Sequence, residues 1–363
     1  EYGLVQDDRW TKYQQTQAVL DTERRRLHDA QCKMIADTQD AGSNRLFILN
    51  TMGEICKPCA VSIFNLAARQ NGKNVIADIC SSGRCPNQAE CWSRRTATFM
   101  ILGDICTRSC KFCATATGKP LPPDRDEPQK LARSVSLMGL KHCVITSVDR
   151  DDLPDGGASH WAASVRAVRE ANPDTTIEVL IPDFDGKGEL IDVVLASAPD
   201  IVGHNIETVE RLTPQVRSRA RYRVSLATLK HIADSGATAK SGLMLGLGES
   251  EEEVLATMDD LLACGCKILT IGQYLRPTLK HLPVAEYVTP EKFAWYKEEA
   301  LRRGFTYVES GPMVRSSYMA ERAMQRCRET DETTTVQQRH HSTTDPAHDV
   351  VENSSAGETL TKQ

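Results

Sequence analysis

Two groups of three cysteines, close together in the chain, constrain this sequence more than any other feature. The first group has the spacing C-x4-C-x5-C and the second has the spacing C-x3-C-x2-C. Their members are Cys80, Cys85 and Cys91, and then Cys106, Cys110 and Cys113. The chain has 13 cysteines, an odd number, and its first residues lack the apolar stretch of a secretion signal. Because disulfide frameworks belong mainly to short secreted chains, metal binding or catalysis is the better interpretation.

The bulk composition narrows the class of protein. Hydrophobic residues make up 40% of 363 residues, which is enough to bury a large core. The net charge of −5 argues against a nucleic-acid-binding protein, whose binding face is usually basic. No apolar run reaches the roughly 18 residues of a transmembrane helix. We therefore expect a cytoplasmic monomer that binds neither nucleic acid nor membrane.

Short apolar stretches alternate with helical stretches from Thr96 onward. Repeated β–α units of this kind predict a parallel sheet. Six units between 96 and about 285 are too few for a complete eight-fold barrel, so we predict an α/β fold with a partial (βα)6 TIM-like barrel. Residues 305–310 are a candidate edge strand. The predicted strands are 96–102, 143–148, 177–181, 201–205, 241–247 and 267–273, and the predicted helices are 128–139, 159–171, 187–196, 222–235 and 250–263.

Composition also suggests how the chain is organised around this barrel. Residues 1–79 read as a helical N-terminal extension, and 80–95 as a cysteine-rich segment. The barrel occupies 96–290, and a C-terminal segment, 291–327, follows it. The tail, 328–363, is rich in polar residues and has no apolar pattern, so we expect it to be disordered.

The second cysteine group follows the first predicted strand, where catalytic loops of barrels lie. Three thiolates can hold three irons of a [4Fe–4S] cluster and leave the fourth iron open. The alternatives are a zinc site or a chance grouping, although structural zinc normally has four ligands. The run from Cys106 to Cys113, with Phe112 before the last cysteine, resembles the signature of the radical S-adenosylmethionine (SAM) superfamily. This resemblance implies that SAM binds the open iron and is cleaved to a 5′-deoxyadenosyl radical.

Two further stretches resemble one branch of this superfamily, the lipoyl synthases. The spacing of Cys80, Cys85 and Cys91 is similar to their auxiliary-cluster motif, and residues 96–103 and 144–153 are similar as well. The run Val314-Arg-Ser-Ser-Tyr318 resembles their C-terminal motif, in which a serine is the fourth ligand of a second [4Fe–4S] cluster. The resemblance assigns this role to Ser317, with Ser316 as the alternative register. A hard oxygen among soft thiolates is a weak, replaceable iron ligand.

The resemblance also implies residues that contact SAM, and Phe112 of the cysteine run is one of them. Gly156 and Gly157 follow the second predicted strand, and Gly246 and Glu249 lie at the end of the fifth. The alternative for the first glycine pair is a simple turn before a helix, because glycine readily adopts turn conformations.

At the end of the fourth predicted strand, Asn205 and Glu207 are candidate contacts to the nucleotide or to the substrate lysine. Gly203 departs from the family, which usually has asparagine before the histidine. His204 can equally be a core histidine, and Arg217 can belong to a solvated charge run or to a docking face for an acidic carrier domain.

The implied reaction inserts two sulfur atoms, at C6 and C8, into an octanoyl chain on a carrier lysine, with the second cluster as the sacrificial sulfur source. The implied partners are octanoylated lipoyl-carrier domains (2-oxoacid dehydrogenase E2 subunits and the glycine cleavage H protein), an electron donor such as ferredoxin or flavodoxin, and iron–sulfur carrier proteins. Two rivals remain: a radical enzyme whose second cluster only relays electrons, and a non-catalytic zinc scaffold. Cys56 and Cys59 form a further pair that we interpret as incidental.

Overall fold

The computed structural model describes residues 87, 90–91, 94–327 and 329. The chain divides into two compact units, Glu1–Ile48 and Leu49–Gln363, and every described residue belongs to the second. The predicted helical extension, Cys80, Cys85, the Cys56/Cys59 pair and the predicted tail apart from Glu329 lie outside the described residues.

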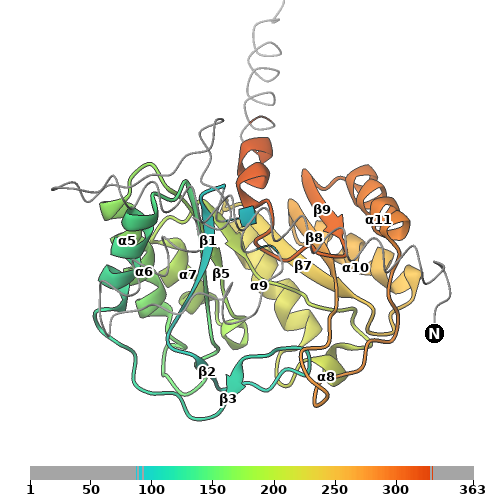
Figure 1. Ribbon diagram of the computed structural model, residues 1–363, viewed down its shortest axis with the longest axis horizontal. Coiled ribbons are helices and arrows are strands. Elements are labelled where there is room, and N and C mark those ends of the chain that lie inside the picture. The colour runs from blue at the N-terminus through green and yellow to red at the C-terminus, as the bar shows by residue number, and fades with distance from the viewer. Residues whose placement is uncertain (1–86, 88–89, 92–93, 328, 330–363) are drawn as a thin grey trace, which may run out of the picture. The chain divides into compact units, whose positions relative to one another are not determined.

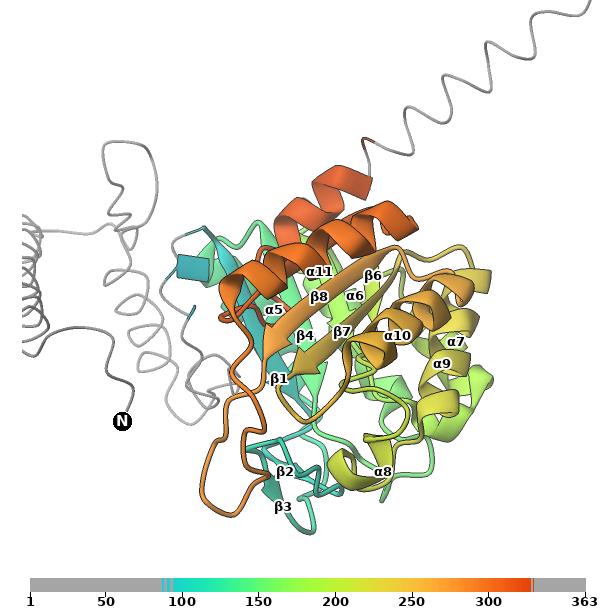
Figure 2. The same ribbon diagram turned by 90° about the vertical axis from the view of Figure 1, so that its right-hand side faces the viewer.

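Seven parallel strands form one sheet in chain order (Figures 1 and 2). Helices follow each of the first six, so the predicted partial barrel of six β–α units is confirmed, and residues 307–311 do add the edge strand. The first and last strands of the sheet are not paired with each other, so the barrel is open. The strands are β1 (Thr96–Ile101), β4 (His142–Ser147), β5 (Thr176–Leu180), β6 (Ile201–Gly203), β7 (Ala239–Leu245), β8 (Ile268–Gln273) and β9 (Tyr307–Gly311).

The helices begin and end at recognisable signals. Ser250 and Glu253 form a capping box at the start of α10, and Gly139 ends α5 in the left-handed conformation. Thr289 caps α11, a helix that our sequence analysis did not predict. The helices are α5 (Glu127–Met138), α6 (Ala158–Ala171), α7 (Gly188–Leu195), α8 (Thr213–Val216), α9 (Tyr222–Asp234), α10 (Glu251–Ala263) and α11 (Pro290–Arg303), with a 3-10 turn, η1 (Phe184–Gly186), and two short strands, β2 (Ile105–Cys106) and β3 (Ala116–Thr117).

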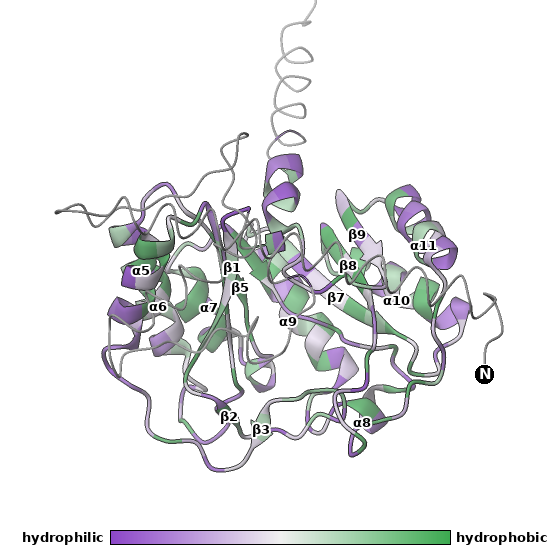
Figure 3. Cartoon of the chain, viewed as in Figure 1, coloured by the Kyte–Doolittle hydropathy of each residue, from purple (hydrophilic) through white to green (hydrophobic). Residues whose placement is uncertain are grey.

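The two faces of the sheet carry different residues. Alternate strand residues such as Leu243, Leu269 and Val308 pack in one core with helix residues such as Val254 and Phe293. Figure 3 shows the hydrophobic strands beside helices that are hydrophilic on their outer side. The residues between them in each strand face the inside of the barrel, and many are small or polar: Thr98, Thr146, Gly203, Gly242, Thr270 and Gly272.

The inner face near the strand N-termini contains a buried ion pair. Lys240 Nζ lies 2.6 Å from Glu178 Oε1, and both side chains are almost fully buried. Burial alone would raise the pKa of Glu178, but Lys240 and His142 outweigh it, and the pKa is lowered. Ile201 and Ile268, on the same inner face, pack with Ala323 and Cys327 of the helical residues 320–327. The C-terminal segment therefore covers the end of the barrel at which the strands begin. In the part of the chain that the structure describes, no helix combines the length and apolarity that crossing a bilayer requires.

Candidate active site

The loop with the second cysteine group lies at the carboxyl end of β1. Cys106 ends β2, and Cys110 and Cys113 follow before β3, at the foot of the sheet in Figure 1. The Cys106 sulfur accepts hydrogen bonds from the backbone N–H groups of Arg108, at 3.4 Å, and Asp149, at 3.3 Å. Burial raises the pKa of the Cys106 thiol to about 11, whereas a coordinated metal ion deprotonates a thiol. Two N–H donors aimed at the sulfur fit a cluster thiolate.

Arg108 anchors this loop from between the first two cysteines. Its Nε and Nη2 donate to the two Asp151 oxygens at 2.9 and 2.8 Å, and Nη2 also lies 2.8 Å from Asp183 Oδ1. The Arg108 side chain is only 3% exposed. Burial would raise the pKa of Asp183, but Arg108 lowers it to about 2. The loop is thus tied to the turns after β4 and β5 by a buried charge network.

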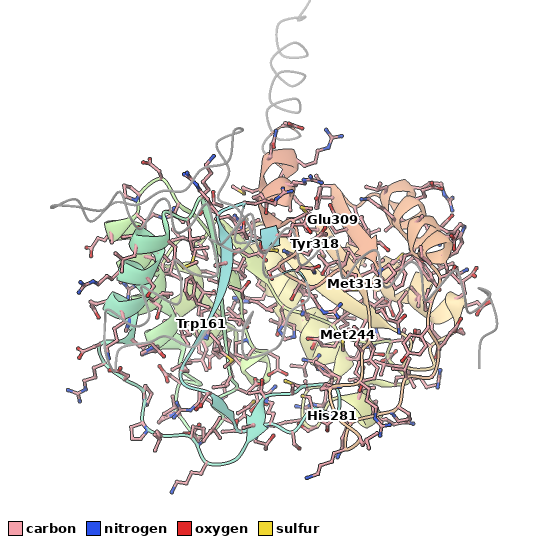
Figure 4. The ribbon with its side chains drawn as sticks, viewed as in Figure 1. Trp161, Met244, His281, Glu309, Met313 and Tyr318 are labelled. Carbon is pink, nitrogen blue, oxygen red and sulfur yellow. The ribbon has the colours of Figure 1, made fainter. Side chains whose placement is uncertain are left out.

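The other two cysteines contact different elements. Cys110 Sγ lies 3.9 Å from Ser218 Oγ, and a His281 ring nitrogen lies 2.9 Å from the Cys113 carbonyl oxygen. Figure 4 shows His281 at the foot of the barrel, at the same end as the cysteine loop. Among the described residues no three His, Cys, Asp or Glu side chains converge closely enough to bind one metal ion. A cubane cluster places its thiolates on separate irons and does not need such convergence.

Gly156 and Gly157 form the turn that starts α6. Both have positive φ, +57° and +89°. A Cβ on Gly157 would lie 2.5 Å from a Leu102 methyl carbon, and one on Gly156 would lie 3.0 Å from the Phe184 ring. The Asp155 carboxylate accepts hydrogen bonds from the backbone N–H groups of Gly157 and Ser159, at 2.9 and 3.0 Å. The turn and its packing therefore account for both glycines without a ligand.

Gly246 and Glu249 also have local roles. Gly246 has a φ of +94°, and a Cβ there would lie 2.4 Å from the Glu286 carbonyl oxygen. The Glu249 carboxylate accepts the N–H groups of Gly246 and Leu247. The structure thus places these residues at the carboxyl end of β7, with the Glu249 carboxylate bound to its own loop.

Glu207 and Arg217 lie together after β6. Glu207 has a φ of +68°, rare for a residue with a side chain, and its backbone pairs with Leu243 of β7. Burial raises the pKa of Glu207, although Arg217 and Asn205 counteract this. The expectation of a solvated or docking Arg217 is wrong, because this side chain is buried and its Nη1 donates to Ser225 Oγ at 2.8 Å. Long-range packing decides this burial, which local charge patterns do not reveal.

His204 is a core histidine. Its Nδ1 lies 2.9 Å from the Ile181 carbonyl oxygen, so this nitrogen is the donor, and Nε2 accepts from Ser225 Oγ at 2.9 Å. Burial, together with Arg217, lowers its pKa to about 4. A neutral histidine therefore supports the turn that carries Asn205 and Glu207.

At the opposite end of β1, the segment with Cys91 contacts the C-terminal segment. Asn87 Nδ2 donates to the Met313 carbonyl oxygen at 2.6 Å, and the Tyr318 hydroxyl lies 3.4 Å from Glu90 Oε1. Burial raises the pKa of Tyr318, with Glu90 and Cys91 adding to the effect. Figure 4 places Tyr318 at the upper end of the barrel, with Met244 between it and His281. Ser317 is therefore in the segment that packs beside Cys91.

The barrel matches a known protein family. The family model of the radical SAM superfamily matches residues 100–261. A lipoyl synthase of Bacteroides fragilis (strain YCH46) is 65% identical over 244 residues, which cover 67% of this chain and 85% of that protein. A lipoyl synthase of Treponema denticola is 58% identical over 244 residues, covering 67% of this chain and 84% of that protein.

The chain belongs to the lipoyl synthase family. Solved structures give a weaker likeness. SuiB of Streptococcus suis bound to SAM has a TM-score of 0.48 at 12% identity and covers 69% of this chain and 60% of that one. Methylornithine synthase has a TM-score of 0.46 at 10% identity and covers 72% of this chain and 78% of that one.

Our sequence analysis did not identify several charged residues around the cysteine loop of this member of the lipoyl synthase family. Asp149 and Asp151 stand in a stretch that resembles the family, directly after a strand, which is where functional side chains of barrels lie. That position was a usable signal. Asp183 follows the third predicted strand and carried the same signal, and Arg108 had one as a cation between two cysteines, whereas nothing in the sequence indicated that Arg217 is buried.

Proposed function

We propose that this protein inserts two sulfur atoms into an octanoyl chain attached to a lysine of a carrier domain, the reaction of a lipoyl synthase. The observation that carries the proposal is the relationship to lipoyl synthases at 58–65% identity, with most of each relative's length covered. The geometry supports it, since β1 separates the segment of Cys91 from the loop of Cys106. A strand of six residues spans about 20 Å, so the two regions lie one strand length apart at the two ends of the same barrel.

In this proposal Cys106, Cys110 and Cys113 would hold one [4Fe–4S] cluster through three thiolates and leave one iron free for SAM. When bound, the cluster would supply the electron that cleaves SAM, and SAM would supply the radical for hydrogen abstraction at C6 and C8. Arg108 holds the loop in place through Asp151 and Asp183. Phe112 packs on the main core beside the loop, which helps to keep water from the site.

The proposed SAM contacts are Gly156, Gly157, Asn205, Glu207, Gly246 and Glu249. Their positions at the carboxyl ends of β4, β6 and β7 support this, because ligands of barrels bind at that end of the sheet. Arg217 is a further candidate for the carboxylate of SAM. Its Nε is buried and has no hydrogen-bond partner in the described part of the chain.

A second cluster, the auxiliary cluster, would be held by Cys80, Cys85, Cys91 and Ser317, with Ser316 as the alternative serine. Contacts of the Cys91 segment with Met313 and Tyr318 support a serine ligand from the C-terminal segment. The protein's own contribution is proximity, since it holds the substrate carbon beside the sulfur source.

The substrates would be octanoylated carrier domains, with a ferredoxin or flavodoxin as electron donor and iron–sulfur carriers for repair of the cluster. A cytoplasmic location and a monomeric state remain parts of the proposal. The rival hypothesis, a radical enzyme whose second cluster only relays electrons, predicts a different product, one that gains no sulfur.

The test is anaerobic reconstitution followed by reaction of an octanoyl-lysyl peptide with SAM and a reductant. We expect about eight irons and eight sulfides per chain and a peptide in which two sulfur atoms replace two hydrogens. A peptide of unchanged mass despite formation of 5′-deoxyadenosine would support the electron-relay rival. Zinc in place of iron and sulfide would support the other rival, a non-catalytic zinc scaffold.

A further inference from the structure

A carboxylate outside the proposed cluster ligands joins two distant parts of the chain. Glu321 Oε1 accepts the Arg94 Nε–H at 2.7 Å, and Glu321 Oε2 accepts the Thr96 hydroxyl at 3.2 Å. Arg94 Nη2 pairs with the same carboxylate. The side chains of Arg94 and Glu321 are 28% and 26% exposed, so the pair is partly exposed. We call Arg94, Thr96 and Glu321 the C-terminal latch.

The latch lies next to both parts of the proposed auxiliary site. Arg94 comes three residues after Cys91, and Glu321 comes four residues after Ser317. The contacts of Asn87 with Met313 and of Glu90 with Tyr318 join the same two segments. We call these contacts between the segment of Cys91 and the segment of Ser317 the seam. The latch lies at one end of the seam.

The segment that carries Ser317 is held at its other end by backbone packing. A Cβ on Gly272 would lie 2.2 Å from the Val314 carbonyl oxygen, so only glycine in β8 leaves room for this backbone. Met319 has a φ of +54°, a conformation that surrounding contacts must maintain. Ser317 thus lies between two fixed points, Val314 and Glu321.

We propose that Glu321 is a positioning residue for sulfur insertion, which holds the serine of the C-terminal segment against the segment of Cys91. This inference rests on the proposed function, because it takes Cys91 and Ser317 as ligands of the sulfur-donating cluster. A partly exposed ion pair contributes little to global stability. Its loss should therefore change the placement of residues 314–321 more than the folding of the barrel.

The experiment compares Glu321→Ala, Glu321→Gln and the exchanged pair Arg94→Glu with Glu321→Arg. Glu210→Gln is the matched control, because Glu210 forms an exposed two-point ion pair with Arg223 away from this seam. Hydrogen exchange of residues 313–321 is measured on the full chain, beside 5′-deoxyadenosine and lipoyl product per chain. We expect faster exchange in Glu321→Ala and a fall of about 10- to 100-fold in lipoyl product. Cleavage of SAM should stay within about twofold of wild type, and the exchanged pair should recover part of the product.

Gly272→Ala is the second variant, because it displaces the same segment from its other fixed point. It should also lower lipoyl product more than cleavage of SAM. The proposal is overturned if Glu321→Ala matches Glu210→Gln in both exchange and product ratio. An equal loss of both products, with global unfolding, in every Glu321 variant and in Gly272→Ala would also overturn it, since that outcome describes a folding role. A wild-type chain that makes no lipoyl product refutes the proposed function itself, and with it this inference.

Discussion

The Arg108 guanidinium and the Asp151 carboxylate form a two-point ion pair that ties the cysteine loop to the turn after β4. The same guanidinium reaches Asp183, so one buried cation pairs with carboxylates from the turns after β4 and β5. The loop that carries Cys106 and Cys110 is therefore shaped by the barrel before any cofactor binds.

Arg108→Ala should leave the Asp183 carboxylate, whose side chain is 2% exposed, buried without a paired cation. Breaking a buried pair costs about 3–5 kcal/mol, and we expect the free energy of unfolding to fall by that amount. Arg108→Lys should rescue it only partly, because an ammonium cannot form the two-point contact. Anaerobic urea unfolding and iron content measure both effects.

Arg219→Ala is the control for this substitution. Arg219 also pairs with Asp185 and Asp151, but 52% of its side chain is exposed, so its loss should cost less than about 1 kcal/mol. Equal losses for the two alanine variants would show that the buried network does not stabilise the loop.

The two cysteine groups should divide the reaction between them. Cys110→Ala should abolish cleavage of SAM, because an open iron needs all three thiolates around its cluster. Cys91→Ala should retain some cleavage but form no lipoyl product. Chromatographic measurement of 5′-deoxyadenosine and lipoyl peptide from the same reaction separates the two steps. Lipoyl product from Cys91→Ala would contradict the assignment.

Ser317 should matter more for turnover than for folding. Ser317→Ala should keep the circular dichroism of wild type and most of the cleavage of SAM, while lipoyl product falls sharply. Ser317→Cys should bind iron more tightly through a soft thiolate and release sulfur poorly. Assayed side by side, Ser316→Ala identifies the register, and wild-type product from both alanine variants would refute a serine ligand.

His204 should make stability depend on pH. Its pKa is about 4 in the folded protein and about 6.5 when unfolded, so the unfolded chain binds the extra proton first as pH falls. The stability that the neutral ring provides is complete above pH 6.5 and is lost as pH falls toward 4, by up to about 1.4 kcal/mol per unit. Protonation would turn Nε2 into a donor toward Ser225 Oγ, which already accepts from Arg217, while Asp183 offers only partial compensation.

Urea unfolding at pH 7 and pH 5 measures this slope in wild type and in His204→Gln. His231→Gln is the control, because His231 is 37% exposed and pairs with Asp192. A slope that is unchanged in His204→Gln would show that another group causes the acid sensitivity.

Much of the fold could be predicted from the sequence because the relevant signals are local. Short apolar runs that alternate with helical stretches predicted six β–α units, with strand limits within two residues of those observed. The placement of Cys106, Cys110 and Cys113 after the first strand followed from the same pattern. The helix at Pro290–Arg303 was missed although Thr289 and Pro290 form a normal start signal.

Charge and packing across the barrel were decided only by the tertiary structure. Arg217 looked solvated because its sequence neighbours are polar, yet the turn after β6 buries it against Ser225. The sequence predicted Gly157 and Gly246 as ligand contacts, and the structure adds a packing reason for both, because Leu102 and Glu286 occupy the space that a Cβ would need. The sequence by itself determined the order of the elements and the two cysteine groups, since these depend on spacing along the chain. Long-range packing, which no local pattern encodes, decided which charges are buried. It also decided that Glu321 contacts Arg94, 227 residues away in the chain.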